Sequence, residues 1–210
     1  MGKIEITKKV LGICATNCYT VVDTETKEAL IIDPADRADV LIRDWKDKGV
    51  TPQAVLLTHG HFDHIGALAG VKKEYPDIKV YAAAEEKEVM ESPALNLSSS
   101  FGAAFTAQAD IYLEDGAEIE ILGRTCKCLL VPGHTKGGMC YYFPEEHVVF
   151  TGDTLFCYSV GRTDFPTGDA KALEDAIREK LFTLPDETLV LPGHDAQTMI
   201  GKEKKGNPYF

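Results

Sequence analysis

No stretch of this sequence is long and apolar enough to cross a membrane, and its first residues lack the basic start, apolar block and cleavage site of a secretory signal. We therefore expect a cytoplasmic protein without a membrane partner. Basic residues are also few, since 22 lysines and arginines stand against 33 acids and leave a formal net charge of −11. This balance disfavours binding to a phosphate backbone, so nucleic acid is not an expected partner.

The six cysteines form no C-x-x-C pair, and without a secretory signal a disulfide framework is not expected. Cys126 and Cys128 are two residues apart in a strand-like run, so both side chains point to one face. A soft-metal site there would need two further ligands that no neighbouring segment supplies. We therefore expect reduced thiols that fill the core.

The chain also lacks low-complexity tracts, internal repeats and Gly/Ser-rich linkers. Its 210 residues, 44% hydrophobic and 26% charged, have the composition of a globular protein. A chain of this length can fold as one unit around a large core. We predict a single domain over residues 1–210.

Strand-like runs alternate with amphipathic helical stretches in two β-rich halves. Helices are predicted over residues 36–48, from about 64 to 75, over 85–91 and after Asp169, a residue type that favours the N-cap. Residues 92–110 have no clear prediction. Two such halves indicate an α/β fold in which two sheets pack face to face with helices outside. The strands are predicted over residues 2–9, 17–23, 28–33, 54–58, 79–83, 118–122, 125–131, 139–143, 147–151 and 188–191.

A cluster of metal-ligand side chains follows the buried strand that ends at Thr58. Imidazole and carboxylate groups are the usual ligands of divalent ions such as zinc, which takes about four to five. Seven candidates therefore suit two ions, with one bridging carboxylate and a coordination position left for water. The candidates are four side chains within six residues, His59, His61, Asp63 and His64, and three that each follow a later apolar run, His134, Asp153 and His194.

A glycine directly precedes three of the candidates, at Gly133, Gly152 and Gly193. Glycine lets the backbone approach an ion closely or take a positive φ, so the repeated device favours one shared site. A lone histidine after a strand is usually structural, but five of the six histidines fall in these motifs. The sixth, His147, follows a turn sequence and is predicted at the surface.

The pattern H-x-H-x-D-H, followed by separate His, Asp and His residues, resembles the metallo-β-lactamase superfamily over essentially the whole chain. Residues 132–137 (PGHTKG) and 152–156 (GDTLF) are similar to glyoxalase II, the hydroxyacylglutathione hydrolases. Residues 161–166 (GRTDFP) and 207–210 (NPYF) resemble the short bacterial relatives of that enzyme. The resemblance implies a four-layer αβ/βα sandwich.

The resemblance also distributes the ligands over two metals. Zinc is the ion most expected, with iron or manganese as alternatives because the same ligands accept them. Asp63 is also expected to orient a hydroxide. Asp33 and Asp195 are expected to orient ligands or to end strands rather than to bind metal. The implied assignment gives His59, His61 and His134 to the first metal, Asp63, His64 and His194 to the second, and a bridging role to Asp153.

These inferences predict a thioesterase that cleaves S-acyl thiols such as S-lactoylglutathione through a metal-bound hydroxide. The chain ends 16 residues after His194 (210 − 194), so the C-terminal helical domain of full-length glyoxalase II is not expected, and glutathione is left open as the thiol. Arg162 is the candidate for binding a substrate anion, although a lone arginine more often ties its own loop.

Two other activities use nearly the same frame. Persulfide dioxygenases of the superfamily share the histidine motif and a GRTDF segment but hold one iron, and lactone hydrolysis fits the metals equally well. A β-lactamase is disfavoured because no export signal is present, and a non-catalytic binding module because it would not need the full ligand set. The native metal, the acyl group and the oligomeric state are left open by the sequence.

Overall fold

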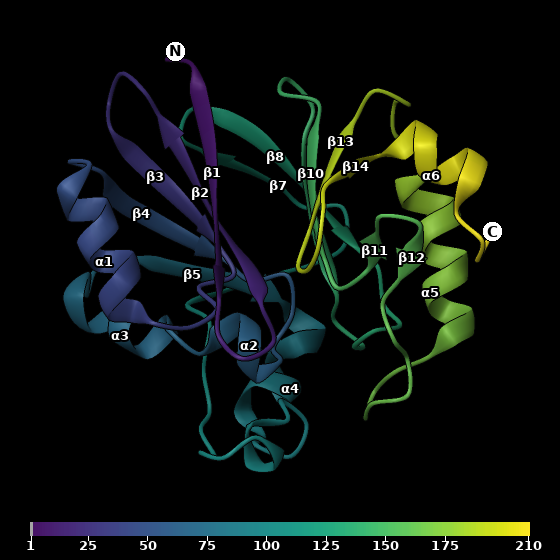
Figure 1. Cartoon of the computed structure of the whole chain (residues 1–210), viewed down its shortest axis with the longest axis horizontal. Helices are drawn as coiled ribbons and strands as arrows, with labels where there is room; N and C mark the ends of the chain where they lie inside the picture. Colours follow the sequence, from purple (N-terminus) through teal and green to yellow (C-terminus); the bar gives the residue numbers. More distant parts are fainter. Residues whose placement is uncertain (1) are drawn as a thin grey trace.

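The computed structural model describes residues 2–210 and contains two six-stranded sheets that face each other (Figure 1). In the first sheet the strands follow one another in sequence order from β1 to β6. The pairs β1–β2 and β2–β3 are antiparallel, and the later pairs are parallel, so they need crossover connections. The strands are β1 (Ile4–Leu11), β2 (Thr16–Asp23), β3 (Glu28–Ile32), β4 (Thr51–Leu56), β5 (Lys79–Ala83) and β6 (Ile111–Leu113).

The second sheet has the order β14-β13-β10-β9-β8-β7. Its neighbours are antiparallel except β10 and β13, which run parallel because the chain returns through a helix between them. A separate hairpin, β11 (Leu155–Phe156) and β12 (Ser159–Val160), follows β10. The strands of the sheet are β7 (Glu118–Ile121), β8 (Arg124–Leu130), β9 (Met139–Phe143), β10 (Val148–Gly152), β13 (Leu189–Pro192) and β14 (Thr198–Met199).

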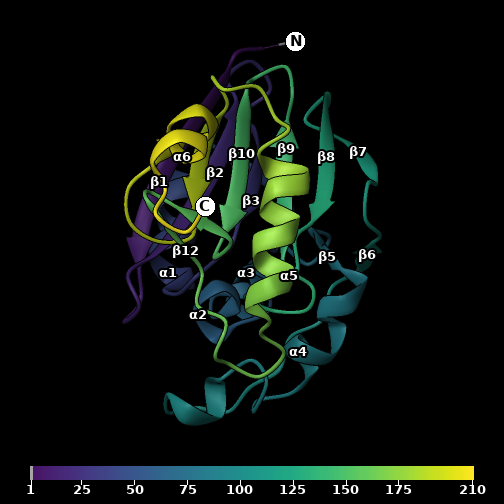
Figure 2. The same cartoon turned by 90° about the vertical axis from the view of Figure 1, so that its right-hand side faces the viewer.

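Helices cover the outer face of each sheet. Figure 1 shows α1 and α3 outside the first sheet, and Figure 2 shows α5 and α6 in front of the second. This is the four-layer αβ/βα sandwich that the resemblance implied, and that prediction is confirmed. The helices are α1 (Ala38–Asp47), α2 (Phe62–Ile65), α3 (Leu68–Glu74), η1 (Ala84–Glu86), α4 (Lys87–Glu91), η2 (Ser98–Ser100), α5 (Ala170–Ala176), the π-helix η3 (Ile177–Leu181) and α6 (Ile200–Gly206).

Three buried clusters fill the spaces between these layers. The middle cluster joins the two sheets and contains Tyr141 and Phe150, together with Cys126 and Cys128, which fill core space as predicted. An outer cluster around Trp45 holds α1 and α3 on the first sheet, and the other holds α5 on the second. Because strand side chains alternate between faces, each sheet supplies apolar groups to both its neighbours.

The segment predicted as one helix from about residue 64 to 75 forms two helices, α2 and α3. The prediction of a single continuous helix was therefore wrong. The break comes where the chain crosses the end of β3. The backbone N–H of Ala67 donates to the carbonyl of Pro34 at 2.9 Å, and a Cβ on Gly66 would lie 2.5 Å from the carbonyl oxygen of Ala35. A tertiary contact therefore ends the helix at this point.

In contrast, Asp169 caps α5 as predicted, accepting a hydrogen bond from the Ala172 N–H at 3.0 Å.

The strands β4, β10 and β13 deliver their C-terminal ends to the same edge of the sandwich, beside α2 (Figure 1). Hydrogen bonds join the loops there. The N–H of Met139 donates to Thr58 O at 2.8 Å, and the N–H of Gly193 donates to Gly152 O at 2.8 Å. Loops from both halves of the chain therefore meet at one place. Within residues 2–210, no helix has the length and apolarity needed to cross a membrane.

Candidate metal centre

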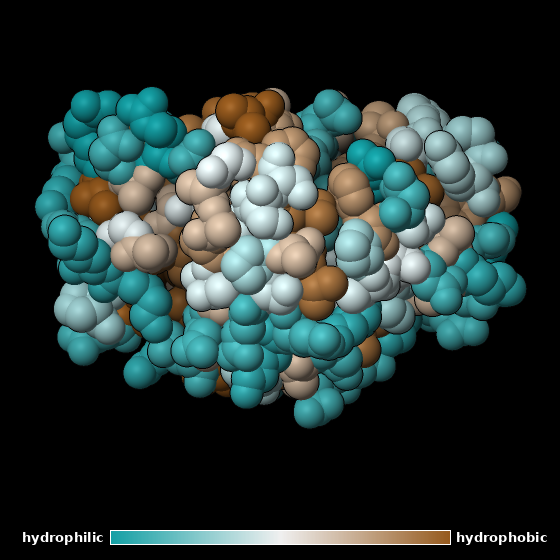
Figure 3. Space-filling model, turned by 90° about the horizontal axis from the view of Figure 1, so that it is seen from below, coloured by the Kyte–Doolittle hydropathy of each residue, from teal (hydrophilic) through white to brown (hydrophobic). Residues whose placement is uncertain are grey.

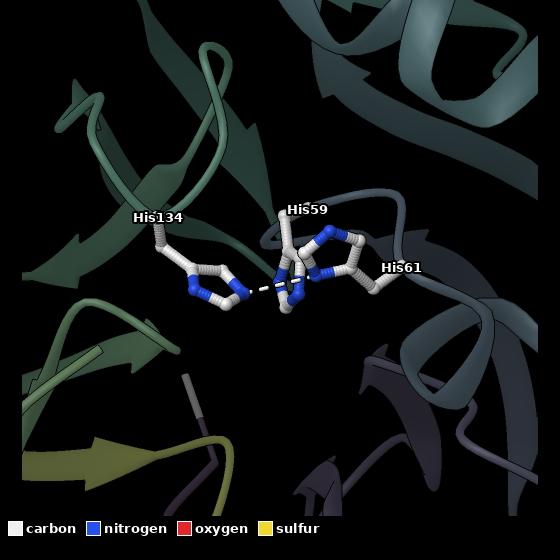
Figure 4. A group of neighbouring side chains, drawn as sticks. All are labelled: His59, His61 and His134. Carbon is white, nitrogen blue, oxygen red and sulfur yellow. Dashed lines mark hydrogen bonds between the residues drawn. The ribbon is translucent and has the colours of Figure 1, made fainter. Parts of the chain in front are cut away.

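Three histidines from two separate loops converge at this edge. His59 and His61 follow β4, and His134 comes from the loop between β8 and β9. Each offers a ring nitrogen within 4.8 Å of the others, and all three side chains are buried. Figure 4 shows the rings pointing toward a common centre, with Nδ1 of His61 2.9 Å from Nε2 of His134. Three buried imidazoles this close form a nitrogen-rich metal site.

A second group lies beside the first. Asp63, His64 and His194 also offer ligand atoms within 4.8 Å of one another. Asp153 lies between the groups: its Oδ1 is 3.4 Å from Nε2 of His64, and its Oδ2 is 3.6 Å from Nε2 of His134 and 3.3 Å from Nε2 of His194. The structure thus brings all seven predicted candidates together, with Asp153 in contact with members of both groups.

The hydrogen bonding of the ring nitrogens indicates whether metal ions fit this cluster. Nδ1 of His64 faces Asp33, and Nδ1 of His134 lies 2.8 Å from the carbonyl of Arg162. Among residues 2–210, the buried atoms without a hydrogen-bond partner include Nε2 of His59, His61 and His64 and Oδ1 of Asp153. Buried polar atoms are normally paired, so four orphans at one point call for a ligand. The residues present therefore fit divalent metal ions.

Burial keeps two of the histidines neutral. Desolvation, joined by the neighbouring imidazoles, lowers the pKa of His59 well below its usual 6.5. Desolvation, with His134 next to it, lowers the pKa of His61 to about 3. A neutral imidazole has the lone pair that a metal ligand needs. At neutral pH these two rings are therefore ready to coordinate.

Charge attraction dominates in the second group. Although burial opposes it, the charge of His64 and a hydrogen bond to His194 lower the pKa of Asp63 to about 2. The same kind of pairing holds the pKa of Asp153 well below its usual range. In return, and against desolvation, the carboxylates raise the pKa of His64 well above 6.5 and that of His194 to about 9. The carboxylates are thus ionised, whereas His64 and His194 hold protons that a metal would displace.

Buried polar residues of β2 hold parts of the centre, and sequence reasoning missed them. The hydroxyl of Thr16 donates to Oδ2 of Asp63 at 2.7 Å. The Asn17 amide and the Tyr19 hydroxyl both donate to the carbonyl of Pro192, at 2.9 and 2.8 Å, just before the His194 loop. The available signal was a run of polar residues at the start of an otherwise apolar strand, because buried polar groups need a partner.

Glu86 was also missed, although it is fully buried at the end of η1, directly before α4. Its Oε1 accepts from the N–H of Gly60 at 2.8 Å, and its Oε2 accepts from the Thr135 hydroxyl at 2.9 Å. It thereby ties the loop of His59 and His61 to the loop of His134. Desolvation raises the pKa of Glu86 to about 7, despite the hydrogen bonds that favour its charged form.

The glycines before the ligands have the role that the sequence predicted. Gly152 has a φ of +49°, and a Cβ there would lie 2.2 Å from Oγ1 of Thr58. A Cβ on Gly193 would lie 2.4 Å from Oδ1 of Asp153. Positive φ at the first and close approach at the second both require glycine, so the prediction is confirmed at these positions.

Arg162 lines the cleft in front of the centre, but its guanidinium is engaged. It donates twice to the Asp164 carboxylate, each time at 2.7 Å, and lies 3.9 Å from the Phe165 ring centroid. Asp195 also lines the cleft and is absent from the ligand groups found among residues 2–210. His147 is exposed in the β9–β10 turn, as predicted.

The two facing sheets, with His and Asp side chains gathered at the ends of their strands, place this chain in the class of the metallo-hydrolases. The chain belongs to the metallo-beta-lactamase superfamily, whose family pattern it matches over residues 11–194. It is 39% identical to the probable metallo-hydrolase YqgX of Bacillus subtilis, over 95% of this chain and 94% of that protein. It is 35% identical to the hydroxyacylglutathione hydrolase GloC of Haemophilus influenzae, over 92% of each.

Among solved structures, the BLEG-1 B3 metallo-beta-lactamase superposes with a TM-score of 0.92 at 40% identity, covering 98% of this chain and 99% of that one. TTHA1623 in a di-iron-bound form superposes with a TM-score of 0.86 at 36% identity, covering 97% and 100%. These similarities place the chain among metal-binding hydrolases. They leave the identity of the metal open.

Proposed function

We propose that this protein is a thioesterase that hydrolyses S-acyl thiols such as S-lactoylglutathione with two divalent metal ions. The single observation that carries the proposal is the position of Asp153, whose two carboxylate oxygens lie 3.3 to 3.6 Å from imidazoles of both ligand groups. One carboxylate shared between two groups of ligands is the arrangement of a two-metal hydrolytic site. Similarity to a relative named hydroxyacylglutathione hydrolase supports the thioester as substrate.

Seven side chains would hold the two ions, with zinc the first choice and iron or manganese as alternatives. When bound, two such ions supply a hydroxide at neutral pH and polarise a substrate carbonyl. The assignment is His59, His61 and His134 for one ion, Asp63, His64 and His194 for the other, and Asp153 shared between them.

The chain itself positions the reacting groups. Thr16 holds one oxygen of Asp63 and so limits rotation of that carboxylate, which can then orient the attacking water. Asp33 holds His64, and Glu86 holds the two loops that carry His59 and His134 in register. A thiolate leaves readily because its ordinary pKa is only about 8.5. No side chain is therefore needed as a general acid for the leaving group.

Metal content and substrate turnover test the proposal together. The metal-free protein is loaded with zinc, manganese or iron, and metals per chain are measured by mass spectrometry. S-lactoylglutathione, simpler thioesters, a lactone and a persulfide with oxygen are then offered. Two metals and thioester turnover are expected. Fewer than one metal per chain would refute the site, and oxygen uptake with one iron and no thioester turnover would assign a persulfide dioxygenase instead.

A variant pair tests the shared carboxylate. Asp153→Ala removes the contact with both groups and is expected to abolish turnover and to lower the metal content while the circular dichroism spectrum is retained. His147→Ala is the matched control, because His147 is exposed in the β9–β10 turn. Turnover at the wild-type rate in Asp153→Ala would contradict the bridging role.

A further inference from the structure

We propose that, among S-acyl thiols, this site prefers substrates with an apolar, uncharged group beside the thioester over thioesters of the charged peptide glutathione. The inference rests on the proposed function and adds the substrate class to it. It is carried by the walls of the cleft of about 460 Å³ that opens in front of the metal centre. Six apolar side chains line this cleft beside the ligands: Phe62, Leu97, Phe101, Phe156, Val160 and Phe165.

The aromatic rings lie directly against the ligands. Phe165 meets the ring of His61 edge-on, with 5.8 Å between centroids, and Phe156 meets His194 at 6.2 Å. Phe62 stands between two ligands in the sequence and stacks on Phe101, with centroids 4.6 Å apart and ring planes 18° apart. Any acyl thiol that brings its carbonyl to the centre therefore places its neighbouring atoms against aromatic carbon.

Phe101 is 49% exposed although it stacks on another aromatic ring at the mouth of the cleft. Seen from the side where α2 and α4 lie, pale residues with a few brown ones occupy the middle of the face, and hydrophilic residues lie to the left, to the right and below (Figure 3). Apolar surface gathered next to a polar reaction centre is typical of a ligand-binding site. An apolar substituent of the substrate would cover it.

Hydrogen bonds within and around residues 92–110 support the apolar side of the cleft. Leu97 has a φ of +66°, a conformation that a leucine rarely adopts. The fully buried Asn96 holds it there: its side-chain amide donates to Phe105 O at 2.9 Å, and its backbone carbonyl accepts from the N–H of Phe62 at 2.8 Å. Backbone strain of this kind persists where surrounding contacts over-determine it, often at ligand sites. The wall is therefore preformed.

The charges around the cleft disfavour an anionic substituent. Of the lining residues within 2–210, Arg162 is the only lysine or arginine. Its Nε and Nη2 both donate to the carboxylate of Asp164. Asp195 adds a negative charge at the same rim, and Lys8, which is outside the lining, donates from Nζ to the backbone carbonyl of Asp195 at 3.1 Å. The chain as a whole carries a formal charge of −11, which disfavours the approach of anionic thiol carriers at long range. Outside the metals, a substrate carboxylate would find no unpaired cation in the lining.

A substrate series tests the inference. Acetyl, butyryl, hexanoyl and phenylacetyl thioesters of N-acetylcysteamine vary the acyl side, and the same acyl groups on glutathione vary the charge of the thiol side. We expect kcat/KM to rise by about fourfold per buried methylene and to be higher on N-acetylcysteamine than on glutathione. A flat acyl series together with a preference for glutathione would overturn the inference while leaving thioester hydrolysis intact.

Binding provides a readout that is independent of turnover. S-phenacyl-N-acetylcysteamine and S-phenacylglutathione are thioethers that cannot be hydrolysed, and both can be titrated calorimetrically into the metal-loaded protein. We expect the neutral compound to bind at least about tenfold more tightly, with a negative heat-capacity change. Equal or reversed affinities would refute the inference even if no thioester were turned over, an outcome that would separately refute the proposed function.

Variants locate the effect in the wall. Phe101→Ala is expected to lower kcat/KM for the phenylacetyl ester about tenfold more than for the acetyl ester, mainly through KM, and to weaken binding of S-phenacyl-N-acetylcysteamine. Val10→Ala is the matched control, because Val10 is 54% exposed on β1 and is absent from the cleft lining. An equal loss on both esters in Phe101→Ala would show a general structural effect and would contradict the assigned role.

Discussion

Nδ1 of His64 lies 2.8 Å from Oδ2 of Asp33, and both side chains are fully buried. Asp33 follows the end of β3, whereas His64 lies in α2, so the contact fixes a ligand to the frame of the first sheet. The other oxygen of Asp33 accepts from the N–H of Thr58 at 2.7 Å. A carboxylate on the far nitrogen of an imidazole sets the tautomer and presents Nε2 to the metal. The sequence predicted that Asp33 orients a ligand or ends a strand rather than binding metal.

Replacing this carboxylate tests the relationship. Asp33→Asn keeps the shape but offers His64 an amide in place of one oxygen. We expect metal affinity to fall by about 10- to 100-fold, measured by competition with a chelator of known affinity. Asp39→Asn is the control, because Asp39 is exposed and contacts Arg37 only at the surface. Unchanged affinity in Asp33→Asn would mean that Asp33 only supports the fold.

Metal loading is expected to depend on pH through His194. Its pKa in the metal-free protein is raised to about 9, so below that pH the ring holds a proton that the metal must displace. Affinity should therefore rise with pH from 7 to 9, by up to about tenfold per pH unit for each proton released. Calorimetric titration in buffers of different ionisation enthalpy counts those protons. Zero release at pH 7 would contradict the protonated state of His194.

Glu86 is expected to make stability pH-dependent in the metal-free protein. Its folded pKa, about 7, exceeds the ordinary 4.5, so between these values the folded state holds the extra proton. This contribution is complete below pH 4.5 and is lost as the pH rises through 7, by up to about 3 kcal/mol. Urea unfolding across this range should show a smaller decline in Glu86→Gln. The exposed Glu88→Gln should follow the wild type, and parallel curves for all three proteins would refute the expectation.

Gly152 is expected to tolerate no side chain. In Gly152→Ala the Cβ would lie 2.2 Å from Oγ1 of Thr58, at a residue with a φ of +49°. Clash and strain together should lower the free energy of unfolding by more than about 3 kcal/mol and should disturb the adjacent Asp153. Gly116→Ala has a comparable φ of +75° but meets nothing within 4 Å, so it should cost only about 1 kcal/mol. Equal losses in chemical denaturation would show that backbone conformation alone matters at Gly152.

The two β-rich halves, the helix after Asp169 and the seven candidate ligands could be predicted from the sequence. These features depend on short-range rules: hydrophobic period, capping chemistry and the spacing of ligand types along one segment. The glycines before the later ligands also carried their meaning in the sequence, because only glycine permits such backbone positions. Family resemblance then linked the separate motifs into one site.

The surroundings of that site could not be predicted without the fold. Thr16 meets Asp63, 47 residues away, because the start of β2 lies beside α2. Glu86 meets Thr135, 49 residues away, because loops from both halves of the chain meet at one edge. The break after α2 and the place of Leu97 at the cleft likewise depend on which distant backbone each segment contacts. Such contacts produce no periodic pattern in a single sequence. A buried polar residue needs a hydrogen-bond partner, but the sequence does not say which distant residue that partner is. The ligands were therefore readable from the chain, whereas their supports and the apolar wall were not.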